Sequence, residues 1–133
     1  LIGHDLVKDV NVIEAAYNDS AGITAAFNRN ILEVVNQELD ADFDPSAFDH
    51  VAFFDIRHEW IEMRLRASRE MTVSVKALDL EVHFDQGEEL RTEISAKFTP
   101  ERLDADFKAA GLVFDDLLTD GEGLYGLSLS HTA

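Results

Sequence analysis

The chain has no cysteine, only two prolines and few basic residues among its 133 residues. The absence of cysteine excludes a disulfide framework and thiolate chemistry, and a reducing cytoplasm fits this composition. Lysine and arginine total 11 against 27 aspartate and glutamate, which gives a formal net charge of −16. So acidic a surface repels phosphate backbones and anionic lipids. We therefore expect neither nucleic acid nor membrane as a partner.

Long hydrophobic runs are also missing, and the stretch from Val51 to Phe54 is typical of the longest ones. This pattern predicts neither a membrane span nor a signal peptide, and we expect a cytoplasmic protein. Hydrophobic residues still make up 46% of the chain, as in folded globular proteins, and the length suits one domain. Because the chain begins in an apolar run at Leu1 and not at a methionine, we interpret it as a piece of a longer protein.

Helical spacing dominates the first third of the chain. Leu1 to Val7 is predicted to be the end of a buried strand, and Asp9 is the predicted N-cap of a short helix. That helix has Ile13, Ala16 and Tyr17 on one face. A longer helix follows, with apolar residues at helical spacing over four to five turns: Ile23, Ala26, Phe27, Ile31, Val34, Val35 and Leu39.

From residue 49 the hydrophobic period changes to two. Three alternating runs, at 60–67, 72–76 and 80–84, predict an antiparallel meander with one face in water. The last part of the chain returns to a helix and then to strands.

Clear helix boundaries frame residues 100–110. Thr99 is the predicted N-cap, Pro100 occupies the first helical position and Gly111 ends the helix, with an inward face formed by Leu103, Phe107 and Ala110. The segments 112–119 and 125–131 then predict a final hairpin.

Two motifs imitate ligand sites. Gly121 to Gly126 matches G-x-G-x-x-G, but only seven residues follow and they have a strand pattern, so we interpret the motif as a hairpin turn. Asp40 to Asp44 resembles the start of a calcium loop, but Pro45 stands where that loop needs glycine. The histidines are single and lack partners at ligand spacing, so we predict no metal site.

A carboxylate and a hydroxyl lie two residues apart just before the Thr99 helix start. If Glu93 to Ser95 is extended, both side chains leave the same face, about 6–7 Å apart. A small planar ligand with two ring nitrogens could be held between them. The pattern alone fits a polar loop at a helix entry equally well.

Five blocks of sequence, with their spacing kept, closely resemble the histidine-specific Nα-methyltransferases of ergothioneine biosynthesis: Asp5–Asp9, Ala15–Tyr17, Thr24–Asn30, Ile61–Leu65 and Thr92–Phe98. The resemblance covers nearly the whole chain. It implies an α/β fold, namely the C-terminal part of a Rossmann-like class I methyltransferase. An α+β substrate-recognition subdomain of two helices plus an antiparallel sheet would be inserted in it.

The resemblance also implies a division of the chain. Residues 1–8 would be the last part of a methyltransferase core strand, the fifth of that sheet. Residues 9–90 would be the inserted subdomain, and 91–133 would return to the core as a helix and a terminal hairpin. The cofactor S-adenosylmethionine would be bound mainly by a missing N-terminal part, so we expect no cofactor-binding residue in this chain.

Four substrate-binding residues follow from the resemblance. Glu93 and Ser95 would hold the imidazole ring, Tyr17 would meet the substrate carboxylate, and Met63 would line the pocket. By pattern alone, Tyr17 and Met63 are ordinary core positions. Phe27 is expected to pack and Asn28 to anchor a neighbouring loop, with substrate contact as the alternative. No catalytic residue is indicated.

The expected function is therefore methylation of the α-amino group of L-histidine, up to the trimethylated betaine hercynine. The alternatives are a related methyltransferase for another amine or amino acid, and a non-catalytic acidic binding domain. The oligomeric state is not predicted. Alone, the chain would expose the sheet edge where a fourth strand belongs, and we expect poor stability or self-association.

Overall fold

A computed structural model describes residues 1–132 of the chain. Within these residues the elements are β1 (Ile2–Asp5), α1 (Val10–Tyr17), α2 (Ile23–Leu39), β2 (Phe48–Asp55), β3 (Trp60–Ala67), β4 (Met71–Val75), β5 (Leu80–Phe84), β6 (Glu89–Ala96), α3 (Pro100–Ala109), β7 (Leu112–Thr119) and β8 (Tyr125–Thr132). Single 3-10 turns precede β2 and follow β4. None of these helices is long and apolar enough to cross a membrane.

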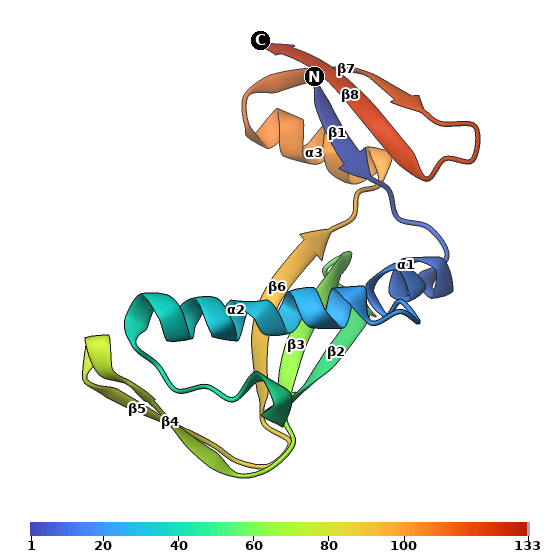
Figure 1. Cartoon of the computed structure of the whole chain (residues 1–133). Coiled ribbons are helices and arrows are strands. Elements are labelled where there is room, and N and C mark those ends of the chain that lie inside the picture. The colour runs from blue at the N-terminus through green and yellow to red at the C-terminus, as the bar shows by residue number, and fades with distance from the viewer. Residues whose placement is uncertain (133) are drawn as a thin grey trace.

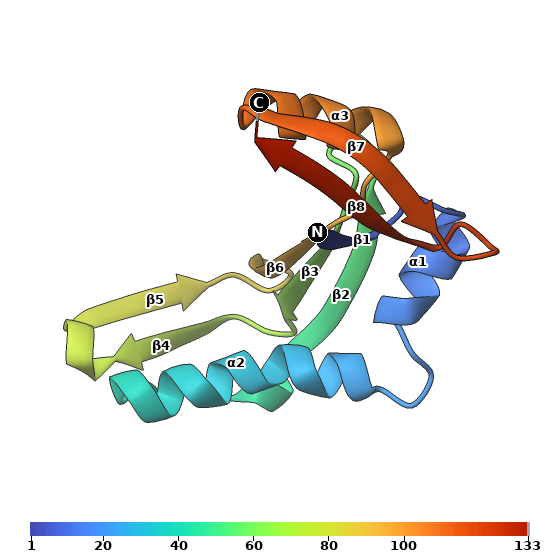
Figure 2. The same ribbon diagram turned by 90° about the horizontal axis from the view of Figure 1, so that it is seen from above.

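The elements form two lobes that two connections join (Figure 1). The terminal lobe consists of the sheet β1-β8-β7 and helix α3. The central lobe consists of the sheet β2-β3-β6, the hairpin β4-β5 and helices α1 and α2. All strand pairs within the three sheets are antiparallel. Seen from above, α2 and the β4-β5 hairpin lie side by side (Figure 2).

The central lobe holds the larger core. Directly opposite residues of paired strands share a face, so the alternating residues of β3 from Ile61 to Ala67 lie on the helix side. One cluster joins Leu32 of α2 to Phe48, Leu65 and the β4-β5 hairpin. A smaller cluster beside it joins Ile13 of α1 to Ile61 and Met63.

The predicted single meander is wrong. β3 pairs with β6, not with β4, and β4 and β5 form a hairpin of their own. Alternation identifies a strand but not its partner. The hairpin leaves the sheet because Val73 and Phe84 pack on the α2 side, in the cluster around Leu32 and Phe48.

The predicted helix ends are confirmed. The Asp9 carboxylate accepts hydrogen bonds from the backbone N–H groups of Asn11 and Val12, and the Thr99 hydroxyl accepts one from Arg102. Gly111 follows α3 at a φ of 73°, a left-handed conformation that glycine adopts without strain. Leu103 and Phe107 are buried as expected, whereas Ala110 is exposed.

The range of α2 is confirmed, but its apolar stripe does not face the core. Ile23 and Phe27 are 71% and 64% exposed, and Ile31 and Val34 are also exposed. The helix instead buries Asn28 and Leu32. The expectation that Phe27 packs in the core is therefore wrong.

The terminal hairpin is confirmed as β7 and β8, and Gly121 to Gly126 includes its turn. Phe107 of α3 stacks on Phe114 of β7 with ring centroids 5.5 Å apart. The lobes join where the chain after β1 runs parallel to the chain after β6. The Phe98 N–H donates a hydrogen bond to the Asp5 carbonyl at 3.0 Å, and the Phe98 carbonyl accepts one from the Val7 N–H at 2.9 Å.

β6 crosses the predicted division at residues 90 and 91. Its hydrogen-bond partner is β3, so residues 91–96 lie in the sheet of the central lobe. The assignment of 1–8, 9–90 and 91–133 to parts of a larger enzyme stays a prediction.

Candidate functional site

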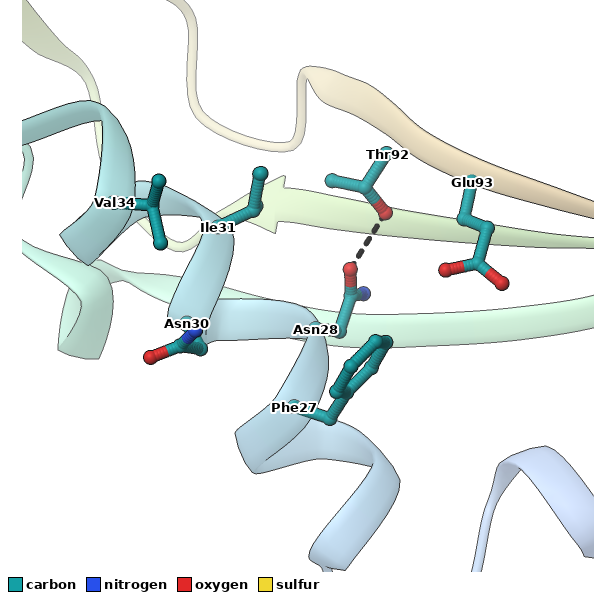
Figure 3. Close-up of a pocket in the computed structure, with 7 residues that line it drawn as sticks. All are labelled: Phe27, Asn28, Asn30, Ile31, Val34, Thr92 and Glu93. Carbon is teal, nitrogen blue, oxygen red and sulfur yellow. Dashed lines mark hydrogen bonds between the residues drawn. The ribbon is translucent and has the colours of Figure 1, made fainter. Parts of the chain in front are cut away.

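Glu93 and Ser95 lie on the helix side of the central sheet. Glu93 is opposite Met63 and Ser95 is opposite Ile61, and both β3 residues belong to the core that α1 covers. The register shifts between Met63 and Arg64, which leaves Thr92 as an extra residue in β6. This bulge lets the adjacent Thr92 and Glu93 both point toward α2 (Figure 3). The extended geometry expected for Glu93 to Ser95 is therefore present.

Helix α1 brings Tyr17 to the same place. Its hydroxyl donates a hydrogen bond of 2.8 Å to the Ser95 hydroxyl, across 78 positions of sequence. The helix is fixed on the sheet because the Glu14 carboxylate accepts a hydrogen bond from the Phe54 backbone. The Tyr17 backbone carbonyl in turn accepts one from Nε2 of His50, at 2.9 Å.

Lys97 completes this cluster and was not predicted as a site residue. Its ammonium group donates to the hydroxyls of Tyr17 and Ser95, at 2.9 Å each, and lies 2.9 Å from Oδ2 of Asp5. The residue is 1% exposed. The alternation of 93, 95 and 97 along an extended chain was the available indication that Lys97 shares this face.

Lys97 and Asp5 are both held in their charged forms by their partners. Burial alone would lower the pKa of Lys97, but hydrogen bonds to Asp5 and Tyr17 outweigh it and raise this pKa above its ordinary value. Burial would raise the pKa of Asp5, yet hydrogen bonds from Lys8 and Lys97 lower it. Both groups are therefore charged at neutral pH.

Asn28 connects α2 to three strands. Its side-chain amide donates to Nδ1 of His50 at 2.9 Å and to the Arg64 carbonyl at 3.0 Å. Its oxygen accepts from the Thr92 hydroxyl at 2.5 Å (Figure 3). The residue is 3% exposed. Asn28 is therefore an anchor, but the expectation that it anchors a neighbouring loop is wrong, because its partners lie on β2, β3 and β6.

A pocket of about 180 Å³ opens between α2 and β6 (Figure 3). It is lined by Phe27, Asn28, Asn30, Ile31, Val34, Thr92 and Glu93. The exposed apolar stripe of α2 thus forms one wall of the pocket, and Glu93 stands at the other.

The four predicted site residues have different surroundings. Glu93 is exposed, and within residues 1–132 its carboxylate makes no hydrogen bond or ion pair. Tyr17 and Ser95 are half-buried, whereas Met63 is 2% exposed and packs against Ile13. Tyr17 therefore meets Ser95, and Met63 pairs with Glu93, but only Glu93 lines the pocket. A free carboxylate on the sheet face that also carries the Tyr17–Ser95 hydroxyl pair can bind a ligand with N–H donors.

Comparison with known proteins gives a consistent result. Residues 1–132 match the model of a family described as histidine-specific methyltransferase, SAM-dependent. The chain is 55% identical over 130 residues to a protein of Mycolicibacterium smegmatis and 52% identical to one of Mycobacterium tuberculosis. Both relatives are named histidine N-alpha-methyltransferase, and each alignment covers 98% of this chain and 40% of the relative.

The chain thus spans about 40% of the length of the curated relatives it matches. The family model, in contrast, covers nearly every residue, including all of the site residues described above. On this ground the chain belongs to the family of SAM-dependent, histidine-specific methyltransferases.

Proposed function

We propose that this chain is the histidine-recognition part of an enzyme that methylates the α-amino group of L-histidine with S-adenosylmethionine. The reaction would proceed to the trimethylated betaine hercynine, a step of ergothioneine biosynthesis. The observation that supports this best is the free Glu93 carboxylate on the same sheet face as the Tyr17–Ser95 hydroxyl pair. The family and the names of its relatives support the reaction class.

Each site residue has a defined role in this proposal. The Glu93 carboxylate accepts a hydrogen bond from one ring N–H of the substrate, and the Ser95 hydroxyl contacts the other ring nitrogen. The Tyr17 hydroxyl meets the substrate carboxylate. Met63 supports the sheet opposite Glu93, and its direct contact with the substrate stays a prediction.

The proposal also describes the fold in more detail than the family match does. In the proposal, β1, β7 and β8 are the fifth, sixth and seventh strands of a Rossmann-like class I core. The order β1-β8-β7, with every pair antiparallel, supports this. The central lobe would then be the inserted substrate-recognition subdomain.

The residues described here do not fit the cofactor. The one stretch that matches a dinucleotide-type glycine motif, Gly121 to Gly126, contains a hairpin turn and opens no helix. We therefore assign cofactor binding to a part of the enzyme outside these residues. The residues of this chain would contribute binding and orientation of the amino acid, which can supply much of the rate of a methyl transfer to an amine.

Calorimetry tests the proposal. The native protein is here the longer enzyme of which this chain is proposed to be a part. Histidine should bind it in the presence of the demethylated cofactor product. Glu93→Ala should weaken that binding by roughly 10- to 100-fold, because a charge-assisted hydrogen bond is lost. Glu93→Gln should weaken it less, since the amide oxygen still accepts a hydrogen bond.

Glu81→Ala is the matched control, because Glu81 is also an exposed strand glutamate but lies on β5. It should leave the affinity unchanged. Tight binding of another amino acid in place of histidine would favour a related methyltransferase. Failure to bind any amino acid would contradict the proposal and favour a non-catalytic binding domain.

A further inference from the structure

Lys97 is buried to an extent that is rare for lysine unless its charge is fully paired. The side chain is 1% exposed, and each of its three N–H groups has a partner 2.9 Å away, on Asp5, Tyr17 and Ser95. Its ammonium group also lies 4.9 Å from the centre of the Tyr17 ring. Two of the three partners, Tyr17 and Ser95, are proposed substrate-binding residues, so Lys97 contacts the proposed site as well as its ion-pair partner Asp5.

The hydrogen bonds of the cluster can be counted. A lysine ammonium only donates, whereas a hydroxyl donates one hydrogen bond and accepts two. Tyr17 and Ser95 therefore each accept one from Lys97, and a further bond joins the two hydroxyls. That bond uses one hydroxyl proton and one lone pair. One proton and one lone pair remain for a ligand, on opposite members of the pair.

We propose that Lys97 is a positioning residue that holds the Tyr17 and Ser95 hydroxyls together and makes their contacts with the amino acid substrate interdependent. The inference rests on the proposed function. When Tyr17 donates its proton to the substrate carboxylate, the hydrogen bond between the two hydroxyls reverses, so Ser95 donates to Tyr17 and is left to accept. With Glu93 accepting from one ring N–H, Ser95 then accepts from the second N–H of a protonated imidazole ring. The cluster therefore favours an amino acid with an N–H-bearing ring over one whose side chain cannot donate.

The position of the charge strengthens the contact with the substrate. Because Tyr17 accepts a hydrogen bond from a cation, its own proton becomes a better donor to a carboxylate. Asp5 faces Lys97 from β1 and is itself paired with Lys8 at 2.5 Å. From α3, Arg102 contacts only the backbone carbonyl of Lys97. Asp5 thus keeps a cationic partner when Lys97 is replaced.

Steady-state kinetics of the native protein test this role. Lys97→Met keeps the length of the side chain but removes its charge and donors. It should raise the KM for histidine about 10- to 100-fold, the loss expected for charge-assisted hydrogen bonds, and change kcat by less than about threefold. Lys8→Met is the matched control, since it removes the other partner of Asp5 without touching the hydroxyls. It should leave KM unchanged.

A double-mutant cycle separates positioning from stability. In a Ser95→Ala background, Lys97→Met should raise KM by no more than about threefold further, because Lys97 acts through the hydroxyl that is already absent. If Lys97→Met does not fold, the cycle of Tyr17→Phe with Ser95→Ala decides. The two effects on KM should then be non-additive by at least about fivefold.

The outcomes of these experiments distinguish the positioning role of Lys97 from the proposed function. A wild-type protein that binds no histidine overturns the proposed function itself. If histidine binds but Lys97→Met leaves KM unchanged, or its effect is the same with and without Ser95, the positioning role is wrong while the proposed function stands. Additive effects of Tyr17→Phe and Ser95→Ala contradict it in the same way.

Discussion

The two lobes differ in the side chains on the open face of their sheet, which is the face that no helix covers. In the central lobe the face away from the helices carries a charged ladder, in which Glu62 accepts hydrogen bonds from Trp60, Arg64 and Arg91. The Arg64 guanidinium also lies over the Phe53 ring at 4.9 Å. In the terminal lobe α3 covers one face, and the other is formed by large exposed side chains: Leu118, Tyr125, Leu127 and Leu129.

The difference shows which of the two open sheet faces can remain in water. A charged face is stable when open, and the central lobe meets this condition. An open apolar face normally belongs to a sheet that is covered on both sides. In the terminal lobe the small residues Gly126 and Ser128 face α3, and the leucines of β8 face outward. The open sheet face of the central lobe therefore needs no cover, whereas that of the terminal lobe does.

The largest expected effect is on the central core. Phe48 is fully buried and lies edge-to-face with Phe84 at 5.5 Å. Phe48→Ala should lower the free energy of unfolding of the native protein by about 3–5 kcal/mol, because the surrounding elements leave a cavity. Phe107→Ala in the terminal lobe should cost less, since Phe107 is 6% exposed whereas Phe48 is fully buried. Urea unfolding followed by circular dichroism measures both, and a larger loss for Phe107 would contradict the comparison.

A somewhat smaller loss is expected at Asn28. Asn28→Ala removes the partner of His50, the Arg64 carbonyl and Thr92 together. We expect a loss of about 2–3 kcal/mol in the free energy of unfolding, because buried polar groups are left unpaired. Asn30→Ala, an exposed residue on the same helix, should stay within about 0.5 kcal/mol. Equal effects of the two variants would show that the network carries no stability.

Asn28 and Phe27 also show why sequence patterns predicted the helices but not their faces. The range of α2, the Thr99 cap and the Gly111 stop are local features, and they were predicted correctly. The buried side of α2 depends on a polar residue, Asn28, whose partners lie 22 to 64 positions away. An apolar stripe indicates which side of a helix avoids water, but not whether that side packs in the core or lines a pocket.

The site was predictable only where its residues alternate along one strand. Glu93 and Ser95 follow from period two, and Lys97 continues it. That Tyr17 lies against Ser95 depends on the docking of α1 on β2 and β3, which no local pattern in residues 10–17 specifies. The Thr92 bulge was likewise invisible, because it exists only relative to the register of β3.

Acidic pH should weaken the central lobe through its charged ladder. Hydrogen bonds from Arg64 hold the pKa of Glu62 below its ordinary value of 4.5, although burial acts in the opposite direction. Stability from a lowered carboxylate pKa is present above 4.5 and is lost as the pH falls through the folded-state value. Glu62→Gln should cost about 1 kcal/mol at pH 7, and this difference should shrink below pH 4.5.

The control for this measurement is Glu81→Gln, because Glu81 is exposed on β5 and lies outside the ladder. Its effect on the free energy of unfolding should be small at every pH. A Glu62→Gln deficit that stays constant between pH 7 and pH 3.5 would mean that packing, not ionisation, explains the loss.

The smallest effect on stability, and the most direct test of the comparison, concerns the open face of the terminal lobe. In the 133-residue chain, Leu127→Ser together with Leu129→Ser should change the free energy of unfolding by only about 0.5 kcal/mol, since both side chains are exposed. The same pair of changes should reduce self-association in analytical ultracentrifugation, because this face and the β1 edge are the expected contacts.

In the native protein the same two changes should instead lower the free energy of unfolding by roughly 2–4 kcal/mol, as expected for core positions, if another part of the enzyme covers the face. A wild-type chain that is monomeric and melts cooperatively would show that the terminal lobe needs no cover, and the contrast between the lobes would then disappear.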